Sequence, residues 1–253
     1  MKSDSFSVER LGLLWDFFLP RIVVQAGWTV AAVAVTYLIL ALSCKVNSIT
    51  LYSMGANLVY LPVYFGPLIF ATYRNRELLA GTPASTSEKA VLMLGYTLVI
   101  LPGFVALLWL SINAIGSGIW PDVNVFSHFD SYFRDLGLKG FIYNSAIIAS
   151  GIPILVSLYT ILSSRRSRVL KGVVAVFATL FGMGLMGAVF ATWLFYQATQ
   201  KILENNNVLP DDFMGALLRD TMPVYVNVYT AAASVMVIIG IIMVWRKVKR
   251  MQI

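Results

Sequence analysis

Six stretches of the chain are long and apolar and carry no charged residue in their interior. A helix of roughly 20 apolar residues crosses a bilayer core about 30 Å thick. The stretches are Ile22 to Ser43, Met54 to Tyr73, Ala90 to Gly116, Gly140 to Leu162, Gly172 to Gln197 and Pro223 to Trp245. They predict an all-α polytopic membrane protein with six transmembrane helices in one domain, residues 1–253.

The composition excludes several other classes of protein. Apolar residues make up 58% of the 253 residues and charged residues 12%, about half the charged share of a typical soluble domain. A soluble enzyme or a disordered scaffold does not have this composition. Cys44 is the only cysteine, so no disulfide forms within the chain. The first apolar stretch begins too late and is too long for a signal peptide, and we expect it to be retained.

The positions of the charges predict the orientation in the membrane. With the N-terminus in the cytoplasm, 14 of the 19 Lys and Arg residues fall on the inner side, together with five of the 12 acids. This is the distribution that the positive-inside rule requires, and six spans then leave both termini cytoplasmic. The net charge of +7 is therefore mostly a topology signal. We expect no nucleic-acid partner, because there is no basic face with aromatic platforms. The basic segments 163–171 and 245–253 are predicted to contact anionic lipids.

Residues 1–21 are predicted to form an interfacial helix on the inner leaflet. Val8, Leu11, Trp15 and Phe18 recur at helical spacing, and Pro20 is expected to end the run. The alternative is a simple apolar lead-in to the first span.

The cytoplasmic loop 74–89, with the sequence RNRELLAGTPASTSEK, has the most informative pattern. Ser85 and Glu88 have the spacing of a capping box, in which each side chain accepts from the backbone N–H of the other residue. A competing helix start lies one turn earlier, at Thr82 and Pro83. Either start places a short helix before the third span. The same pattern also fits an ordinary capped turn.

Residues that carry chemistry are scarce, and we predict that the chain is not an enzyme and has no cofactor or metal site. There is no phosphate-binding glycine loop, no G-x-S-x-G and no H-E-x-x-H. His128 is the only histidine. Because no carboxylate pair lies inside a span, we expect any energy for transport to come from another protein.

The fifth stretch contains pairs of small residues at four-residue spacing, Gly184 with Ala188 and Gly187 with Ala191. Such pairs let helices approach closely. Packing inside the chain is the favoured role, and a dimer interface is the alternative.

The segment that precedes the third span resembles a group of membrane subunits of ABC transporters common in Bacteroidetes. Those subunits carry a Leu-Pro-Ala-Ser-x-x-Glu-Lys signature at this position. Five residues of the chain match it: Pro83, Ala84, Ser85, Glu88 and Lys89. Thr82 stands where the family usually has Leu. The motif covers about eight residues, whereas the overall layout is similar to an exporter-type permease along the whole chain.

The resemblance implies a permease subunit of an ATP-driven exporter in the bacterial cytoplasmic (inner) membrane. In such exporters a short helix between spans 2 and 3 docks on a separate ATP-binding subunit. The residues implied to couple the two subunits are Arg74, Arg76, Glu77, Pro83, Ser85, Glu88 and Lys89. The translocation pathway would form in a homodimer or in a heterodimer with a related permease. The resemblance implies no particular cargo or substrate-binding residue.

Two other functions fit the same sequence. A membrane scaffold or accessory subunit would bind a protein partner and transport nothing. A facilitator would transport its substrate without ATP.

Overall fold

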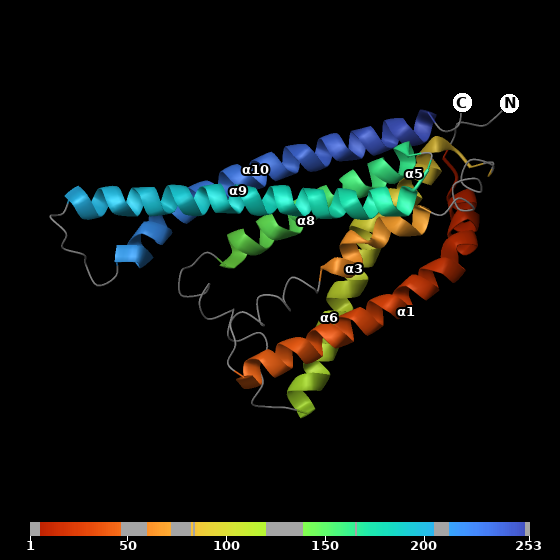
Figure 1. The fold of residues 1–253 in the computed structure, drawn as a ribbon. Coiled ribbons are helices and arrows are strands. Elements are labelled where there is room, and N and C mark those ends of the chain that lie inside the picture. Colours follow the sequence, from red (N-terminus) through yellow and green to blue (C-terminus); the bar gives the residue numbers. More distant parts are fainter. Residues whose placement is uncertain are drawn as a thin grey trace.

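The computed structural model describes residues 6–46, 60–71, 82, 84–119, 139–164, 166–204 and 213–250. Within these ranges the chain is helical apart from short turns and contains no strand, which confirms the predicted all-α class. The elements in chain order (Figure 1) are α1 (Val8–Val46), α3 (Leu61–Tyr64), the 3-10 helix η1 (Gly66–Phe70), α5 (Thr86–Gly95), the π-helical η2 (Tyr96–Ile100), α6 (Leu101–Ile119), α8 (Lys139–Ser163), α9 (Arg168–Glu204) and α10 (Phe213–Arg250).

Four helical runs are long and apolar enough to cross a membrane. They are Val8–Leu42, Thr86–Ile119, Arg168–Gln200 and Pro223–Arg250, and two shorter apolar segments are Leu61–Phe70 and Ile148–Ser163. Large apolar side chains are exposed along these helices, most of all on α9. Water does not tolerate so extensive an apolar surface, so the helices indicate a membrane-embedded protein.

Pro20 does not end the N-terminal helix, contrary to the prediction. It lies inside α1, which runs for 39 residues and joins the predicted interfacial helix to the first span. Leu14 and Phe18 before the proline and Val33 after it are buried in the same core, and this shared packing offsets the hydrogen bond that proline removes. The first part of α1 takes a different direction from the rest (Figure 1), as expected for a proline kink.

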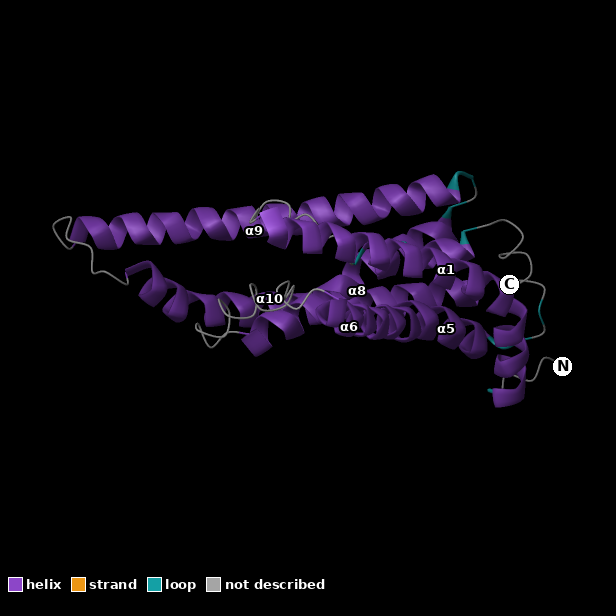
Figure 2. Ribbon diagram, turned by 90° about the horizontal axis from the view of Figure 1, so that it is seen from below, coloured by secondary structure: helices purple, strands orange, loops and turns teal. Residues whose placement is uncertain are grey.

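The helices α8, α9 and α10 form one group, with α8 packed against both of the others (Figure 2). Two glycines allow α8 and α10 to approach closely. A Cβ atom on Gly240 would lie 2.9 Å from Leu155, and one on Gly151 would lie 3.2 Å from Val237. Ser157 of α8 donates a hydrogen bond of 3.2 Å to the carbonyl oxygen of Gly172 in α9.

Aromatic contacts join α1 to η1 and to the start of the third predicted span. The ring centroids are 5.7 Å apart for Phe18 and Phe70 and 6.2 Å apart for Phe70 and Tyr96. Trp15 meets Tyr96 edge to face at 6.4 Å. As a result, the N-terminal parts of α1 and α5 lie side by side, at the end of the molecule where α9 begins and α10 ends (Figure 1).

The small residues of α9 do not pack inside the described part of the chain, which corrects the favoured prediction for them. A Cβ atom added at Gly182, Gly184 or Gly187 would have no heavy atom within 4 Å. The neighbouring Ala188 and Ala191 are exposed. None of the described residues therefore covers this face of α9.

We predict that Gly116→Ala destabilises the contact between α1 and α6. A Cβ atom at Gly116 would collide with the ring of Tyr37, which is buried and packs against Trp109 with 6.2 Å between the ring centroids. Overpacking of this kind costs about 1–3 kcal/mol. Thermal unfolding of the detergent-solubilised protein measures the effect. Gly118→Ala is the matched control, because nothing lies within 4 Å of a Cβ there. Equal stability of the two variants would contradict the prediction.

Candidate functional site

Three of the seven predicted coupling residues lie in the described part of the chain: Ser85, Glu88 and Lys89. The other four, Arg74, Arg76, Glu77 and Pro83, lie outside the described residues. The candidate site is therefore the end of the loop 74–89, where the chain enters α5.

The predicted capping box is present at the start of α5. Ser85 is the N-cap, and its hydroxyl oxygen accepts from the backbone N–H of Glu88 at 3.3 Å. The backbone N–H of Ser85 donates in return to Oε2 of Glu88 at 2.8 Å. The helix begins at Thr86, so of the two alternatives the structure has the start at Ser85.

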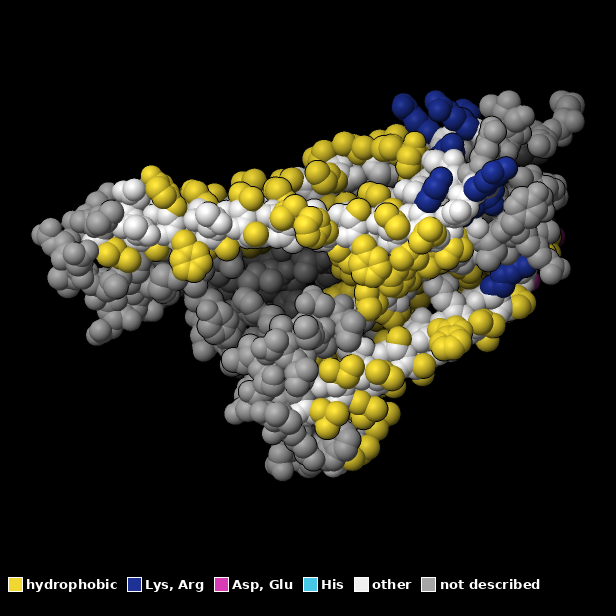
Figure 3. Space-filling view, viewed as in Figure 1, with side chains coloured by type: hydrophobic (Ala, Val, Ile, Leu, Met, Phe, Trp, Pro, Cys, Tyr) yellow, Lys and Arg dark blue, Asp and Glu magenta, His cyan; other side chains and the backbone are white. Residues whose placement is uncertain are grey.

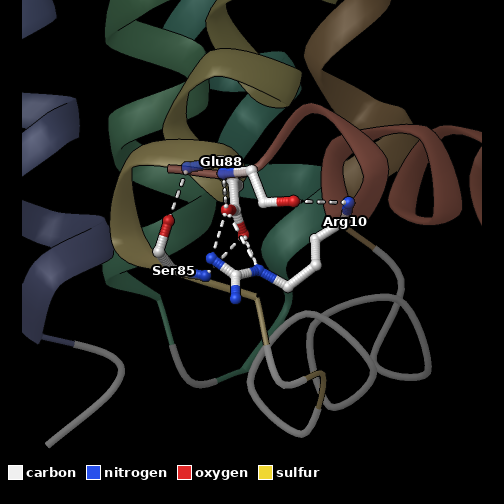
Figure 4. A network of polar contacts seen from close by, with 4 residues as sticks. Arg10, Ser85 and Glu88 are labelled. Atoms are coloured by element: carbon white, nitrogen blue, oxygen red, sulfur yellow. Dashed lines mark hydrogen bonds and ion pairs between the residues drawn. The ribbon is translucent and has the colours of Figure 1, made fainter. Parts of the chain in front are cut away.

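Arg10 in the first turn of α1 reaches across to the same carboxylate (Figure 4). Its Nη2 atom lies 2.9 Å from Oε1 of Glu88, and its Nε atom lies 3.2 Å from Oε1 and 3.3 Å from Oε2. Charge-assisted hydrogen bonds of this kind are roughly twice as strong as neutral ones.

Glu88 also contacts the residue that caps α1. Ser7 precedes α1, and its hydroxyl oxygen lies 3.4 Å from the backbone N–H of Arg10, which donates to it. The backbone N–H of Ser7 donates to Oε1 of Glu88 at 2.7 Å. One carboxylate therefore accepts hydrogen bonds from the N-cap residues of two helices. Ser7 and Glu88 are 81 positions apart in the sequence. We call this arrangement the Glu88 clamp: the carboxylate of Glu88, the guanidinium of Arg10 and the backbone N–H groups of Ser7 and Ser85.

Hydrogen bonds keep the buried carboxylate of the clamp charged. The side chain of Glu88 is fully buried, while that of Arg10 is 30% exposed. Glu88 lies in the first turn of α5, ahead of the apolar stretch that starts at Ala90. Burial raises the pKa of its carboxyl group, but the hydrogen bonds from Arg10, Ser85 and Ser7 and the charge of Arg10 outweigh burial and lower the pKa to about 2. The same pairing raises the pKa of Arg10. Both groups are thus charged at neutral pH.

Apolar side chains surround the clamp. Leu14 and Phe18 of α1 and Leu92 and Met93 of α5 are buried in one cluster that also includes Ala84. A cavity of about 150 Å³ lies beside Arg10 and is lined by Leu13, Leu14, Phe17, Thr82 and Ala84 as well. The carboxylate of Glu88 therefore lies against apolar side chains, whereas the guanidinium of Arg10 remains partly exposed.

Lys89 is buried next to Glu88, with 2% of its surface exposed. Neither side chain is therefore presented on the surface of the isolated chain. Direct contact of Glu88 or Lys89 with a partner stays a prediction. The role that this geometry supports for Glu88 is to hold the end of the loop against α1.

A second polar link ties the same elements together deeper in the bundle. The hydroxyl of Tyr96, at the start of η2, donates to Oε1 of Gln25 in α1 at 2.8 Å. The Nε2 atom of Gln25 lies 3.4 Å from the carbonyl oxygen of Gly66 in η1, to which it donates. The bond from Tyr96 and the clamp connect α1 to the continuous helical segment of α5 and η2 at two levels, and the bond from Gln25 to Gly66 connects α1 to η1.

The Glu88 clamp and the bond between Tyr96 and Gln25 join α1 to α5 and η2. Where the structure describes the chain, no three His, Cys, Asp or Glu residues come together as a metal site would need. His128 lies outside the described residues. The carboxylate of Glu88 is already occupied by donors from Arg10, Ser7 and Ser85.

Comparisons with protein-family models, with curated proteins and with solved structures found no match to this chain. The functional proposal therefore depends on the residues and contacts of the chain itself.

We predict that Glu88→Gln destabilises the protein by about 2 kcal/mol. Glutamine removes the charge that pairs with Arg10, and its single oxygen replaces only one of the two carboxylate oxygens that accept from the backbone N–H groups of Ser7 and Ser85. Hydrogen bonds to charged groups contribute about 1.5–3 kcal/mol. Chemical or thermal unfolding in detergent measures the change. The matched control is Glu9→Gln, which removes an exposed acid from the first turn of α1 and should cost less than about 0.5 kcal/mol. A loss no larger in Glu88→Gln than in Glu9→Gln would show that the Glu88 clamp does not stabilise the fold.

Proposed function

We propose that the chain is the membrane permease subunit of an ATP-driven ABC exporter, in which loop 74–89 receives the motion of a separate ATP-binding subunit. The observation that carries the proposal is the Glu88 clamp. The loop ends at Ser85, and the clamp joins this point to α1 and α5 through buried, charge-assisted bonds. A displacement imposed on the loop would therefore move two membrane helices together.

The proposal needs a mechanical link because the chain shows no energy source of its own. The six apolar stretches carry no ionisable side chain of Asp, Glu, Lys, Arg or His in their interior. A conformational change in such a protein requires a partner that binds its two states with different affinity. An ATP-binding subunit docked at the loop would be this partner.

We further propose six spans with both termini in the cytoplasm of a bacterial cell. The four long apolar runs and the two shorter segments match the six predicted stretches in order. Helices α1, α5 and α9 begin, and α8 and α10 end, at the same end of the molecule (Figure 1), which fits alternating passages through a membrane. The Lys and Arg side chains that Figure 3 shows gather at that end. The open small-residue face of α9 suits a second permease subunit, whether an identical or a related one.

Photo-crosslinking in native membranes tests the coupling proposal. We expect a photoreactive residue at Glu77, within loop 74–89, to capture a protein with an ATP-binding motif. The control position is Arg166, an exposed residue of the turn between α8 and α9 at the same end of the molecule, and we expect no such capture there. The yield at Glu77 should change with ATP. Capture of a protein without an ATP-binding motif, or equal capture from both positions, would contradict the proposal and favour a scaffold.

A further inference from the structure

Basic side chains gather at the tip of the molecule, beyond the apolar surface of its helices (Figure 3). In this region α10 ends beside the C-terminal part of α8. An open cleft of about 140 Å³ lies there, lined by Tyr159 of α8 and by Met243, Arg246, Lys247 and Arg250 of α10. We call it the α8–α10 cleft. It is several times larger than the space that one water molecule needs.

We propose that the α8–α10 cleft binds the phosphate group of an anionic phospholipid, with the acyl chains lying along α10. This inference concerns a different site from the Glu88 clamp and does not depend on the proposed function.

The positive charge of the residues that line the cleft favours the binding of an anion. Three cations lie within five residues of α10, and the described residues that line the cleft include no Asp or Glu. The ion pair between Arg10 and Glu88 lies outside the cleft. The C-terminal dipole of α10 offsets roughly half a charge, which is far less than three. The guanidinium groups of Arg246 and Arg250 lie one turn apart and offer the fork of donors that matches phosphate.

Continuity of the cleft with an apolar face favours a lipid over a free phosphate ion. Arg250, Arg246, Met243, Ile239 and Met236 follow one another at steps of four and three residues, so they share one face of α10. Ile239 is 50% exposed and Met236 is 57% exposed. The face is thus basic at the tip and apolar below it. This order matches the anionic headgroup and the apolar acyl chains of a phospholipid in a leaflet.

The aromatic residues beside the cleft indicate the depth of the headgroups. Trp245 is 37% exposed on the turn of α10 that carries Arg246, and Tyr159 lines the cleft. Trp and Tyr side chains concentrate at the interface between membrane and water. The cleft would then lie where phosphate groups of the leaflet lie.

Native mass spectrometry of the detergent-solubilised full chain tests the proposal. Phosphatidylglycerol is the anionic probe, phosphatidylcholine the zwitterionic probe, and glycerol phosphate the probe without acyl chains. We expect the wild-type protein to retain phosphatidylglycerol in preference to phosphatidylcholine. Arg246→Gln with Arg250→Gln should weaken retention at least about tenfold, because each arginine would donate charge-assisted hydrogen bonds to the phosphate group.

The matched control is Lys171→Gln with Lys249→Gln, which removes the same charge from exposed residues that do not line the cleft. Both residues lie in the basic segments 163–171 and 245–253, so this variant measures the general attraction of those segments for anionic lipids. We expect less than about a threefold effect from it. Equal effects of the two double variants would overturn the proposal in favour of attraction by the overall charge. Displacement of phosphatidylglycerol by glycerol phosphate at an equal concentration would overturn the lipid assignment in favour of a soluble phosphate. The single variant Arg250→Gln, in the last turn of α10, provides the same comparison with a weaker effect if the double variant does not fold.

Discussion

The carboxylate of Glu88 links the N-termini of two helices, α1 and α5, at the end of the molecule where both begin. A charged carboxylate without partners would be too costly to bury. Here the backbone N–H groups of Ser7 and Ser85 and the guanidinium of Arg10 all donate to it. Because Ser7 caps α1 and Ser85 caps α5, the start of one helix cannot move far without the other. The positive ends of the two helix dipoles add to the attraction.

The clamp defines how force could pass through the protein. Loop 74–89 enters α5 at Ser85, and the apolar cluster of α1 and α5 begins directly behind the clamp. Deeper in the bundle, the bond between Tyr96 and Gln25 repeats the connection. The α8–α10 cleft belongs to the other helix group, at the same end of the molecule (Figures 1 and 3). The proposed coupling contact and the proposed lipid contact thus lie on different helices.

Short-range features of this structure could be predicted from the sequence, and long-range ones could not. The capping box needs two residues three positions apart, so Ser85 and Glu88 identify it locally. The all-α class follows from charge-free runs longer than a strand. The pairing of Arg10 with Glu88 joins residues 78 positions apart, and no local pattern indicates it. Arg10 could be interpreted only as a topology charge. The prediction that the helix ends at Pro20 was wrong for a related reason. Contacts with distant parts of the chain on both sides of Pro20 keep α1 continuous. The open face of α9 likewise depends on where the other helices lie.

A double-mutant cycle on Arg10 and Glu88 tests the central claim most directly. Unfolding free energies of the wild type, Arg10→Gln, Glu88→Gln and the double variant yield the interaction energy of the two side chains. The Glu88 clamp predicts an interaction energy of at least about 1.5 kcal/mol, because the pair is buried on the Glu88 side and charge-assisted. An interaction energy near zero, with additive effects of the two substitutions, would contradict the claim that the pairing of Arg10 with Glu88 stabilises the contact between α1 and α5.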